Sequence, residues 1–182
     1  MNSAKEFKKL LNNCQDTLNW GGSLHKYLTT MIDALEGLKA VSDKNKAKKV
    51  YREAYQHFRY ALRSARRLNR YYGKIKDSLE RLKPLFGTAM RKQVEEIEQR
   101  LRPQKAVVIA KASFFRGELN KDLNAIEARM VTSRLTAREV DAFNGKIRQI
   151  IAADRRSVGL VPFLIEVRNL QRLLQGVQRR VA

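Results

Sequence analysis

Apolar residues recur at steps of three and four along most of this 182-residue chain, a spacing that places them on one face of an α-helix. The clearest run steps by four and three from Leu24 through Leu28, Met31 and Leu35 to Leu38, which is the seam of a helix that packs lengthwise against other helices. Runs of β-branched and aromatic residues between turn signals, which are typical of strands, are scarce. The sequence therefore predicts an all-α protein, either an antiparallel helical bundle of about six or seven helices or two stacked helical subdomains.

Capping residues, glycines and prolines set the expected helix boundaries. Gly21 and Gly22 are expected to end the first helix and Gly73 the third, because glycine supplies the left-handed conformation that often follows a helix. Pro103 is expected to end another helix, because proline interrupts helical hydrogen bonding. The predicted helical segments are residues 3–19, 23–41, 44–72, one or two further turns over 74–83, 88–102, 106–131, a segment opened by the capping box Thr136-x-x-Glu139 and a last segment starting near Pro162.

The main predicted boundary lies between Pro84 and Gly87, two residues that break helices. It divides a basic N-terminal helical unit, residues 1–83, from a C-terminal helical unit, residues 88–182. The two units can also form one continuous domain.

Residues 106–110, with the sequence AVVIA, fit either a short buried strand or the start of a longer helix. The apolar pattern that follows favours a long helix over residues 106–131, disturbed near Gly117. A single strand would also have no partner for its backbone hydrogen bonds.

The most unusual segment is the basic stretch, residues 44–76. It holds twelve of the 38 lysines and arginines and a single acid, Glu53, so a net charge of +11 out of the total +20 lies there. Five of the six tyrosines lie there as well: Tyr51, Tyr55, Tyr60, Tyr71 and Tyr72. Such a concentration of positive charge favours attraction to nucleic acid, to an anionic membrane or to an acidic protein.

On a helical projection the basic stretch has two opposite faces. Its apolar face contains Ala47, Val50, Ala54, Phe58, Ala61, Ala65, Leu68 and Tyr72, and its basic face contains Lys48, Arg52, Arg59, Arg63, Arg66 and Arg70. The basic face runs for about 33 Å at the helical rise. Neighbouring like charges on a helix repel by a few tenths of a kcal/mol per pair, and almost no glutamate offsets this repulsion, so an external anion is expected.

The candidate nucleic-acid-binding residues are the cations and two tyrosines of this face and its edges. They are Lys48, Lys49, Arg52, Tyr55, Arg59, Tyr60, Arg63, Arg66, Arg67 and Arg70. Arginine suits the role because its planar guanidinium binds phosphate oxygens with two hydrogen bonds. The alternative to a binding role is that these residues form an ordinary solvent-exposed helix face without a ligand. The tyrosines flanking the face, Tyr55, Tyr60 and Tyr71, either stack on unpaired bases or pack at the edge of the core.

Two further basic features remain as hypotheses. A second cluster near the end of the chain is a candidate extension of the binding surface, and its members are Arg155, Arg156, Arg168, Arg172, Arg179 and Arg180. Residues 136–169 also admit a helix-turn-helix with Gly145 in the turn, although a single helix through Gly145 is the simpler interpretation.

No motif in the chain indicates catalysis, a cofactor or a metal. A glycine-rich phosphate loop, a nucleophile elbow and a zinc-protease motif are all absent from the sequence. His25 and His57 have no cysteine or carboxylate nearby in sequence at metal-ligand spacing, and Cys14, the only cysteine, lies on an apolar helix face. We therefore expect a non-enzymatic protein without cofactor or metal.

The expected function is sequence-independent binding of RNA or DNA through the basic stretch. The alternative is a helical assembly or adaptor protein that uses its leucine seams and basic face to bind itself or an acidic protein. A membrane-surface role is less favoured, because the face opposite the charge carries mostly Ala, Val and Tyr rather than bulky apolar residues. The apolar runs are shorter than a membrane span, so a soluble protein in the cytoplasm or associated with the nucleoid is expected.

Overall fold

The computed structural model describes residues 2–132 and 134–181, and this part of the chain is helical without any strand. The α-helices are α1 (Ser3–Glu36), α2 (Lys44–Leu82), α3 (Thr88–Phe114), α4 (Asn120–Val131), α5 (Ala137–Ala153) and α6 (Leu160–Val181). Short 3-10 turns, η1 (Gly37–Ala40) and η2 (Lys83–Leu85), follow α1 and α2, and a π-turn, η3 (Phe115–Leu119), joins α3 to α4. The predicted all-α fold is confirmed.

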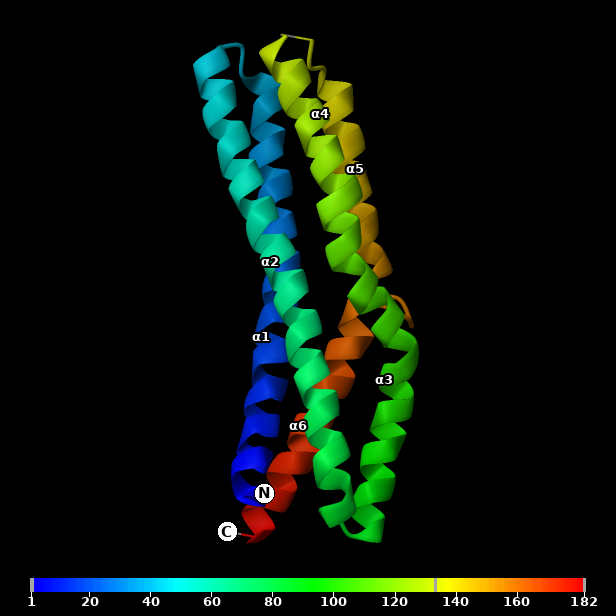
Figure 1. Ribbon diagram of the computed structural model, residues 1–182. Coiled ribbons are helices and arrows are strands. Elements are labelled where there is room, and N and C mark those ends of the chain that lie inside the picture. Colours follow the sequence, from blue (N-terminus) through cyan, green and yellow to red (C-terminus); the bar gives the residue numbers. More distant parts are fainter. Residues whose placement is uncertain (1, 133, 182) are drawn as a thin grey trace.

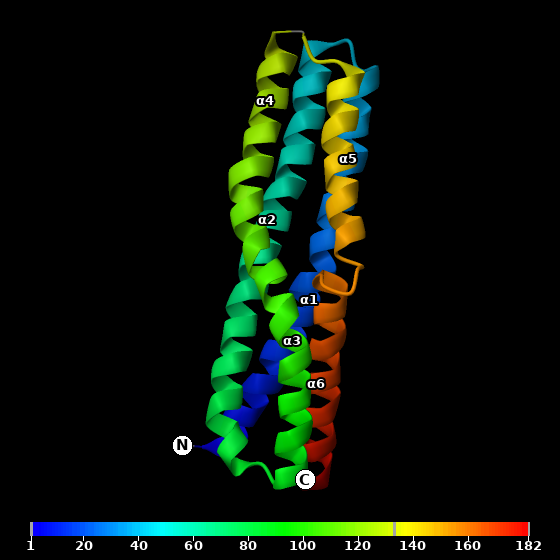
Figure 2. The ribbon, with the colours of Figure 1, turned by 90° about the vertical axis from the view of Figure 1, so that its right-hand side faces the viewer.

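The helices form an elongated bundle of antiparallel rods (Figures 1 and 2). The first rod is α1 and the second is α2. The third is α3 continued by α4, and the fourth is α5 followed by α6. Because α3, η3 and α4 are continuous, the described residues contain five separate helical segments rather than the expected six or seven. The start of α1 and the end of α6 lie at the same end of the bundle (Figure 1).

Helix α1 runs without interruption through the glycines that were expected to end it. Its buried seam alternates steps of four and three along the whole helix, and comprises Leu10, Cys14, Thr17, Gly21, Leu24, Leu28, Met31 and Leu35. A Cβ atom on Gly21 would lie 2.4 Å from Cδ2 of Leu164 in α6. Gly21 therefore allows α6 to approach closely, and the predicted helix end at residues 20–22 is wrong.

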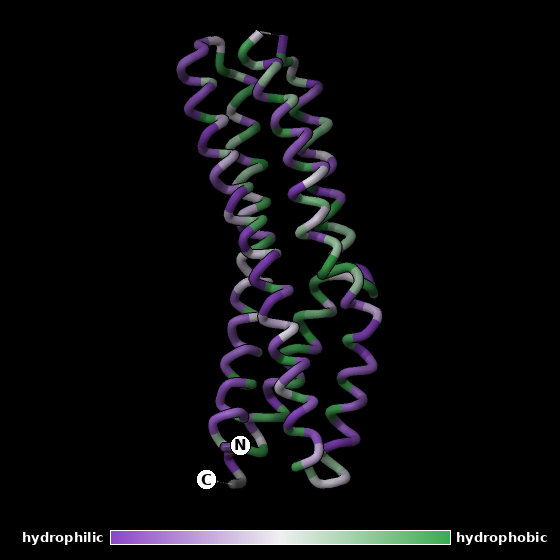
Figure 3. The backbone as a smooth tube through the Cα atoms, viewed as in Figure 1, coloured by the Kyte–Doolittle hydropathy of each residue, from purple (hydrophilic) through white to green (hydrophobic). Residues whose placement is uncertain are grey.

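Helix α2 likewise continues past Tyr72 and Gly73 to Leu82, so the predicted stop at Gly73 is wrong. Buried residues recur every seven positions along it, at Ala47, Ala54, Ala61, Leu68, Ile75 and Leu82, with Tyr51, Phe58, Ala65 and Leu79 between them. Each rod thus presents one apolar side to the interior, seen as repeated green segments in Figure 3. Gly73 itself is exposed, with open space where a Cβ would lie.

The third rod contains both a proline and a change of register. Pro103 lies on the exposed side within α3, so the predicted helix end there is wrong. Residues 106–110 are helical, and the disturbance predicted near Gly117 is confirmed as the π-turn η3. Buried Phe115, Leu119 and Leu123 follow one another at two successive steps of four, which adds one residue to the seven-residue repeat. The backbone N–H of Asn120 donates to the carbonyl of Phe115, so the π-turn takes up the extra residue.

The fourth rod is divided by a link at residues 154–159. Helix α5 opens with the predicted capping box, in which Thr136 and Glu139 each cap the other's backbone. It continues through Gly145, so the helix-turn-helix alternative is not adopted. A Cβ on Gly159 would lie 2.6 Å from the carbonyl oxygen of Asp154, so the link needs glycine at this position.

The buried apolar residues of all six α-helices form one hydrophobic cluster along the bundle. In the described residues no helix is long and apolar enough to cross a membrane. The core therefore lies between the rods, and the outward side of each rod remains available for other roles.

We predict that Gly73→Ala stabilises the protein. Because α2 continues through Gly73 and the position is open, alanine gains helix propensity without a clash, worth about 1 kcal/mol. Urea denaturation followed by circular dichroism measures the change, and Gly159→Ala, which meets backbone atoms, is the destabilising control. A loss of stability in Gly73→Ala would show that the helix ends at this glycine.

Candidate nucleic-acid interface

The basic face is carried by a single continuous helix. The carboxylate of Asp43 caps α2, accepting from the backbone N–H of Asn45 at 2.7 Å and of Lys46 at 3.2 Å. The seven-residue repeat of the buried seam keeps the same side of α2 outward along the rod. Arg52, Arg59 and Arg66, also seven residues apart, therefore lie in one outward row.

The eight cations predicted as contacts are all exposed, and they are Lys48, Lys49, Arg52, Arg59, Arg63, Arg66, Arg67 and Arg70. All eight apolar-face residues predicted for the same helix are buried or half-buried, so the two opposite faces are confirmed. We call the eight exposed cations the α2 basic face.

The charge of the α2 basic face is not neutralised within the protein. Among the described residues, none of the twelve cations in residues 44–76 forms an ion pair with a carboxylate. Cations elsewhere do: Lys83 lies 2.9 Å from Glu98, and Arg100 lies 3.0 Å from Glu166. The face is thus a row of solvated positive charges that can take external anions.

The two tyrosines among the predicted contacts lie at opposite borders of the face. Tyr55 is half-buried toward α4, where its hydroxyl lies 3.5 Å from Oδ1 of Asn120 and its ring stacks on Tyr51. Tyr60 is half-buried toward α1, with its ring centroid 5.2 Å from that of Tyr27. Both rings thus pack against neighbouring protein groups.

Cations cover the remaining aromatic rings beside the face. The guanidinium of Arg67 lies 4.4 Å from the ring centroid of Trp20 on α1, and the ammonium of Lys74 lies 5.0 Å from that of Tyr71. Such cation–π contacts contribute about 0.5–1 kcal/mol at exposed sites. They hold the two cations at the border of the face while leaving their charge in solvent.

Tyr51 and Tyr72 belong to the interior. The Tyr51 hydroxyl donates to the carbonyl of Leu123 at 3.0 Å, and the Tyr72 ring meets Phe163 edge to face. Burial raises the pKa of both phenols, assisted by the negative charge of Glu127 for Tyr51 and of Glu98 for Tyr72. These phenols therefore stay neutral and serve packing.

The second basic cluster does not join the α2 basic face. Arg168, Arg172 and Arg179 are exposed on α6, and Arg155 and Arg156 are exposed in the preceding link. Helix α6 packs mainly against α1 and α3 and meets the inner side of α2 through Phe163 and Tyr72, so its exposed arginines lie away from the outward side of α2. The side chain of Arg180 lies outside the described residues.

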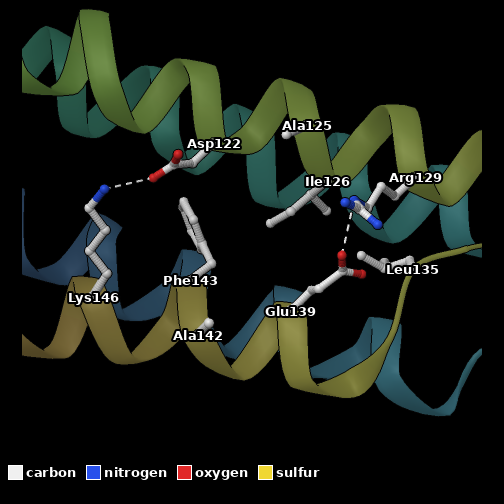
Figure 4. Close-up of a pocket in the computed structure, with 9 residues that line it drawn as sticks. All are labelled: Asp122, Ala125, Ile126, Arg129, Leu135, Glu139, Ala142, Phe143 and Lys146. Atoms are coloured by element: carbon white, nitrogen blue, oxygen red, sulfur yellow. Dashed lines mark hydrogen bonds and ion pairs between the residues drawn. The ribbon is translucent and has the colours of Figure 1, made fainter.

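A groove of about 310 Å³ lies between α4 and α5 (Figure 4). Ile126 and Phe143 contribute its apolar lining. Its charged residues pair with each other, Lys146 with Asp122 at 2.8 Å and Arg129 with Glu139 at 2.9 Å. The groove therefore offers no unpaired charge to an ionic ligand.

A buried ionic cluster that is not predicted from the sequence lies at the link between α5 and α6. The carboxylate of Asp154, which is 1% exposed, lies 2.5 Å from the ammonium of Lys111 and 2.7 Å from Nε2 of His25. Gln104 donates to the carbonyl of Ser157 and accepts from the N–H of Gly159. Gln104 and Lys111 occupy buried seam positions of α3. Polar residues at positions where the repeat calls for apolar ones are the sequence feature that could have indicated a buried polar cluster.

This cluster is suited to holding the link rather than to chemistry. Burial acts to raise the pKa of Asp154, but the hydrogen bonds and charges of His25 and Lys111 outweigh it and lower the pKa. In the described residues no group of three or more His, Cys, Asp or Glu side chains could hold a metal ion. Burial raises the pKa of the Cys14 thiol to about 12, so this thiol stays protonated.

We predict that Asp154→Asn destabilises the protein by about 3 kcal/mol, because it leaves the Lys111 ammonium buried without an anion. The contribution of Asp154 is complete above the ordinary pKa of an unfolded aspartate, about 3.9, and is lost as pH falls through its lower folded pKa. Urea denaturation of both proteins between neutral and acidic pH should show the difference shrinking below about pH 4. The adjacent exposed change Arg155→Ala is the control, with an expected effect within about 0.5 kcal/mol.

Comparison of this chain with protein families, curated proteins and solved structures found no match. The interpretation of the interface therefore depends on its own geometry and charge.

Proposed function

We propose that this protein is a non-catalytic nucleic-acid-binding protein, which contacts phosphates of RNA or DNA through the α2 basic face largely independently of sequence. The observation that supports the proposal is the row of eight exposed cations on one helix that have no carboxylate partner among the described residues. A protein that neutralises phosphates releases condensed counterions, and this release drives binding. Contacts of this kind position a protein on the backbone without reading base sequence.

The exposed arginines fit this role better than a structural one. In the part of the chain that the structure describes, none of them joins neighbouring elements through an ion pair, and their mutual repulsion costs stability. Phosphates supply the opposite charge, and the arginine fork binds them with two parallel hydrogen bonds. A helix face selected for solubility alone would gain from interspersed acids, and Glu53 is the only acid in residues 44–76.

The alternative function, that of an assembly or adaptor protein, depended partly on exposed leucine seams, and the fold buries these seams. The leucine seam of residues 24–38 lies in α1 and the following turn η1, and its residues are buried inside the bundle. The seam of α6 is likewise buried at Phe163, Val167, Leu170 and Leu174. A partner helix therefore has no access to these seams, and an acidic protein on the α2 basic face remains the alternative occupant.

We predict that changing Arg59, Arg63 and Arg66 to Glu abolishes nucleic-acid binding while the helical circular dichroism stays unchanged, because the three side chains are exposed and form no ion pair among the described residues. Fluorescence anisotropy with a labelled oligonucleotide measures binding. The matched control changes Lys92, Arg102 and Arg116 to Glu; these cations are also exposed and lie on the third rod. The control lowers the net charge equally and should retain most of the affinity. Equal losses in both variants would indicate only a general effect of net charge.

We also predict that affinity falls steeply with salt and that a single Arg63→Ala change lowers the slope of log affinity against log salt by about one. Losing one cation–phosphate contact lowers the number of counterions released on binding by about one. Titrations at several salt concentrations measure both slopes. An unchanged slope in Arg63→Ala would exclude this arginine from the phosphate contacts.

A further inference from the structure

Every aromatic ring beside the α2 basic face already has a protein partner. Tyr55 stacks on Tyr51, Tyr60 packs on Tyr27 of α1, and Arg67 lies over Trp20. The fourth ring, Tyr71, has the Lys74 ammonium over it. Proteins that bind single strands instead present aromatic rings on which successive bases stack. Each of these rings therefore already packs against another protein group, and no row of unpartnered rings lies beside the face in the described residues.

The shape of the face also differs from a single-strand channel. A single strand is usually held in a positively charged groove that follows its flexible backbone. The groove between α4 and α5 has internally paired charges, and a second groove of about 430 Å³ is lined by α1, the α2–α3 link and α6. Neither is lined by residues 44–76. The cations instead occupy the outward side of one rod.

The length of the α2 basic face suits a stiff, densely charged ligand. Its cations project from a helix that is buried along its inner side, so the backbone positions that carry them form a fixed, straight line, although the side chains themselves remain flexible. From Lys48 to Arg70 the face spans about 33 Å, close to one turn of duplex at about 34 Å. A duplex keeps its phosphates at fixed positions and carries one charge for about every 1.7 Å of its axis, whereas a single strand would lose conformational freedom along this line without gaining base stacking.

We infer that the ligand of the α2 basic face is double-stranded nucleic acid, contacted along about one turn through its phosphates, with the neighbouring tyrosines serving only to pack the face. This inference rests on the proposed function and deepens it. Sequence independence follows, because no contact reads a base edge.

The test compares a labelled 20-base-pair duplex (about two turns) with each of its separated strands by fluorescence anisotropy at one salt concentration. The duplex should bind on the order of tenfold more tightly than either strand. Tyr71→Leu should leave both affinities unchanged, because the ring is not a stacking platform. Inorganic polyphosphate at equal phosphate concentration should displace less than half of the duplex.

The outcomes separate the inference from the proposed function. Tighter binding of a strand, or loss of strand affinity by about tenfold or more in Tyr71→Leu, overturns the duplex assignment and leaves nucleic-acid binding intact. Complete displacement by polyphosphate shows that charge alone is recognised and also overturns the assignment. If neither duplex nor strand binds, or if Arg59, Arg63 and Arg66 can be changed to Glu without effect, the proposed function itself fails.

Discussion

Burial of apolar seams between antiparallel rods is the interaction on which the rest of the structure depends. The seams of α1 and α2 repeat every seven residues along helices of 34 and 39 residues. Burial of one leucine or phenylalanine side chain contributes about 1.5–3 kcal/mol, whereas repulsion between neighbouring cations on a helix costs only a few tenths of a kcal/mol per pair. The inner side of α2 therefore dominates its stability, and its outer side can carry an uncompensated row of cations. The same hierarchy explains why single glycines in α1 and α2, each worth about 1 kcal/mol, do not end these helices.

Polar side chains at seam positions connect α1 and α3 to the α5–α6 link in the middle of the bundle. Asp154 links α1 and α3 to the α5–α6 link through His25 and Lys111, and Gln104 holds the backbone of that link. A buried ion pair is weak support for overall stability, because desolvation offsets its attraction, but removing one partner is costly. We therefore regard this cluster as fixing where the fourth rod divides. The π-turn η3 has a related effect, because it realigns the apolar residues of α4 with the interior after α3.

The α2 basic face combines three properties that rarely arise from solubility alone. Its cations are exposed, they lack carboxylate partners in the described residues, and they are carried by one uninterrupted helix. The aromatic residues that would suggest single-strand binding from sequence are turned toward α1 and α4 or covered by cations. The arrangement is a ridge of charge on a rigid support, which suits phosphates at fixed spacing better than a flexible strand.

By itself the sequence determined the all-α class, the capping box at Thr136, and the opposite apolar and basic faces of α2, because each follows from local spacing of residues. The continuity of α1 is also present in the sequence, since Thr17 and Gly21 continue the spacing of Leu24 and Leu28, although glycine taken locally predicts a helix end. Only the tertiary structure decided that Gly21 accommodates Leu164, that Pro103 stays within a helix, and which charged residues find partners. Lys111 and Asp154 meet although they are far apart in sequence, and Arg81 near the end of α2 meets Glu6, whereas the cations of residues 44–76 pair with no carboxylate of the described residues. Side-chain pairing between rods depends on how the rods are arranged in space, and local spacing along one helix carries no information about it.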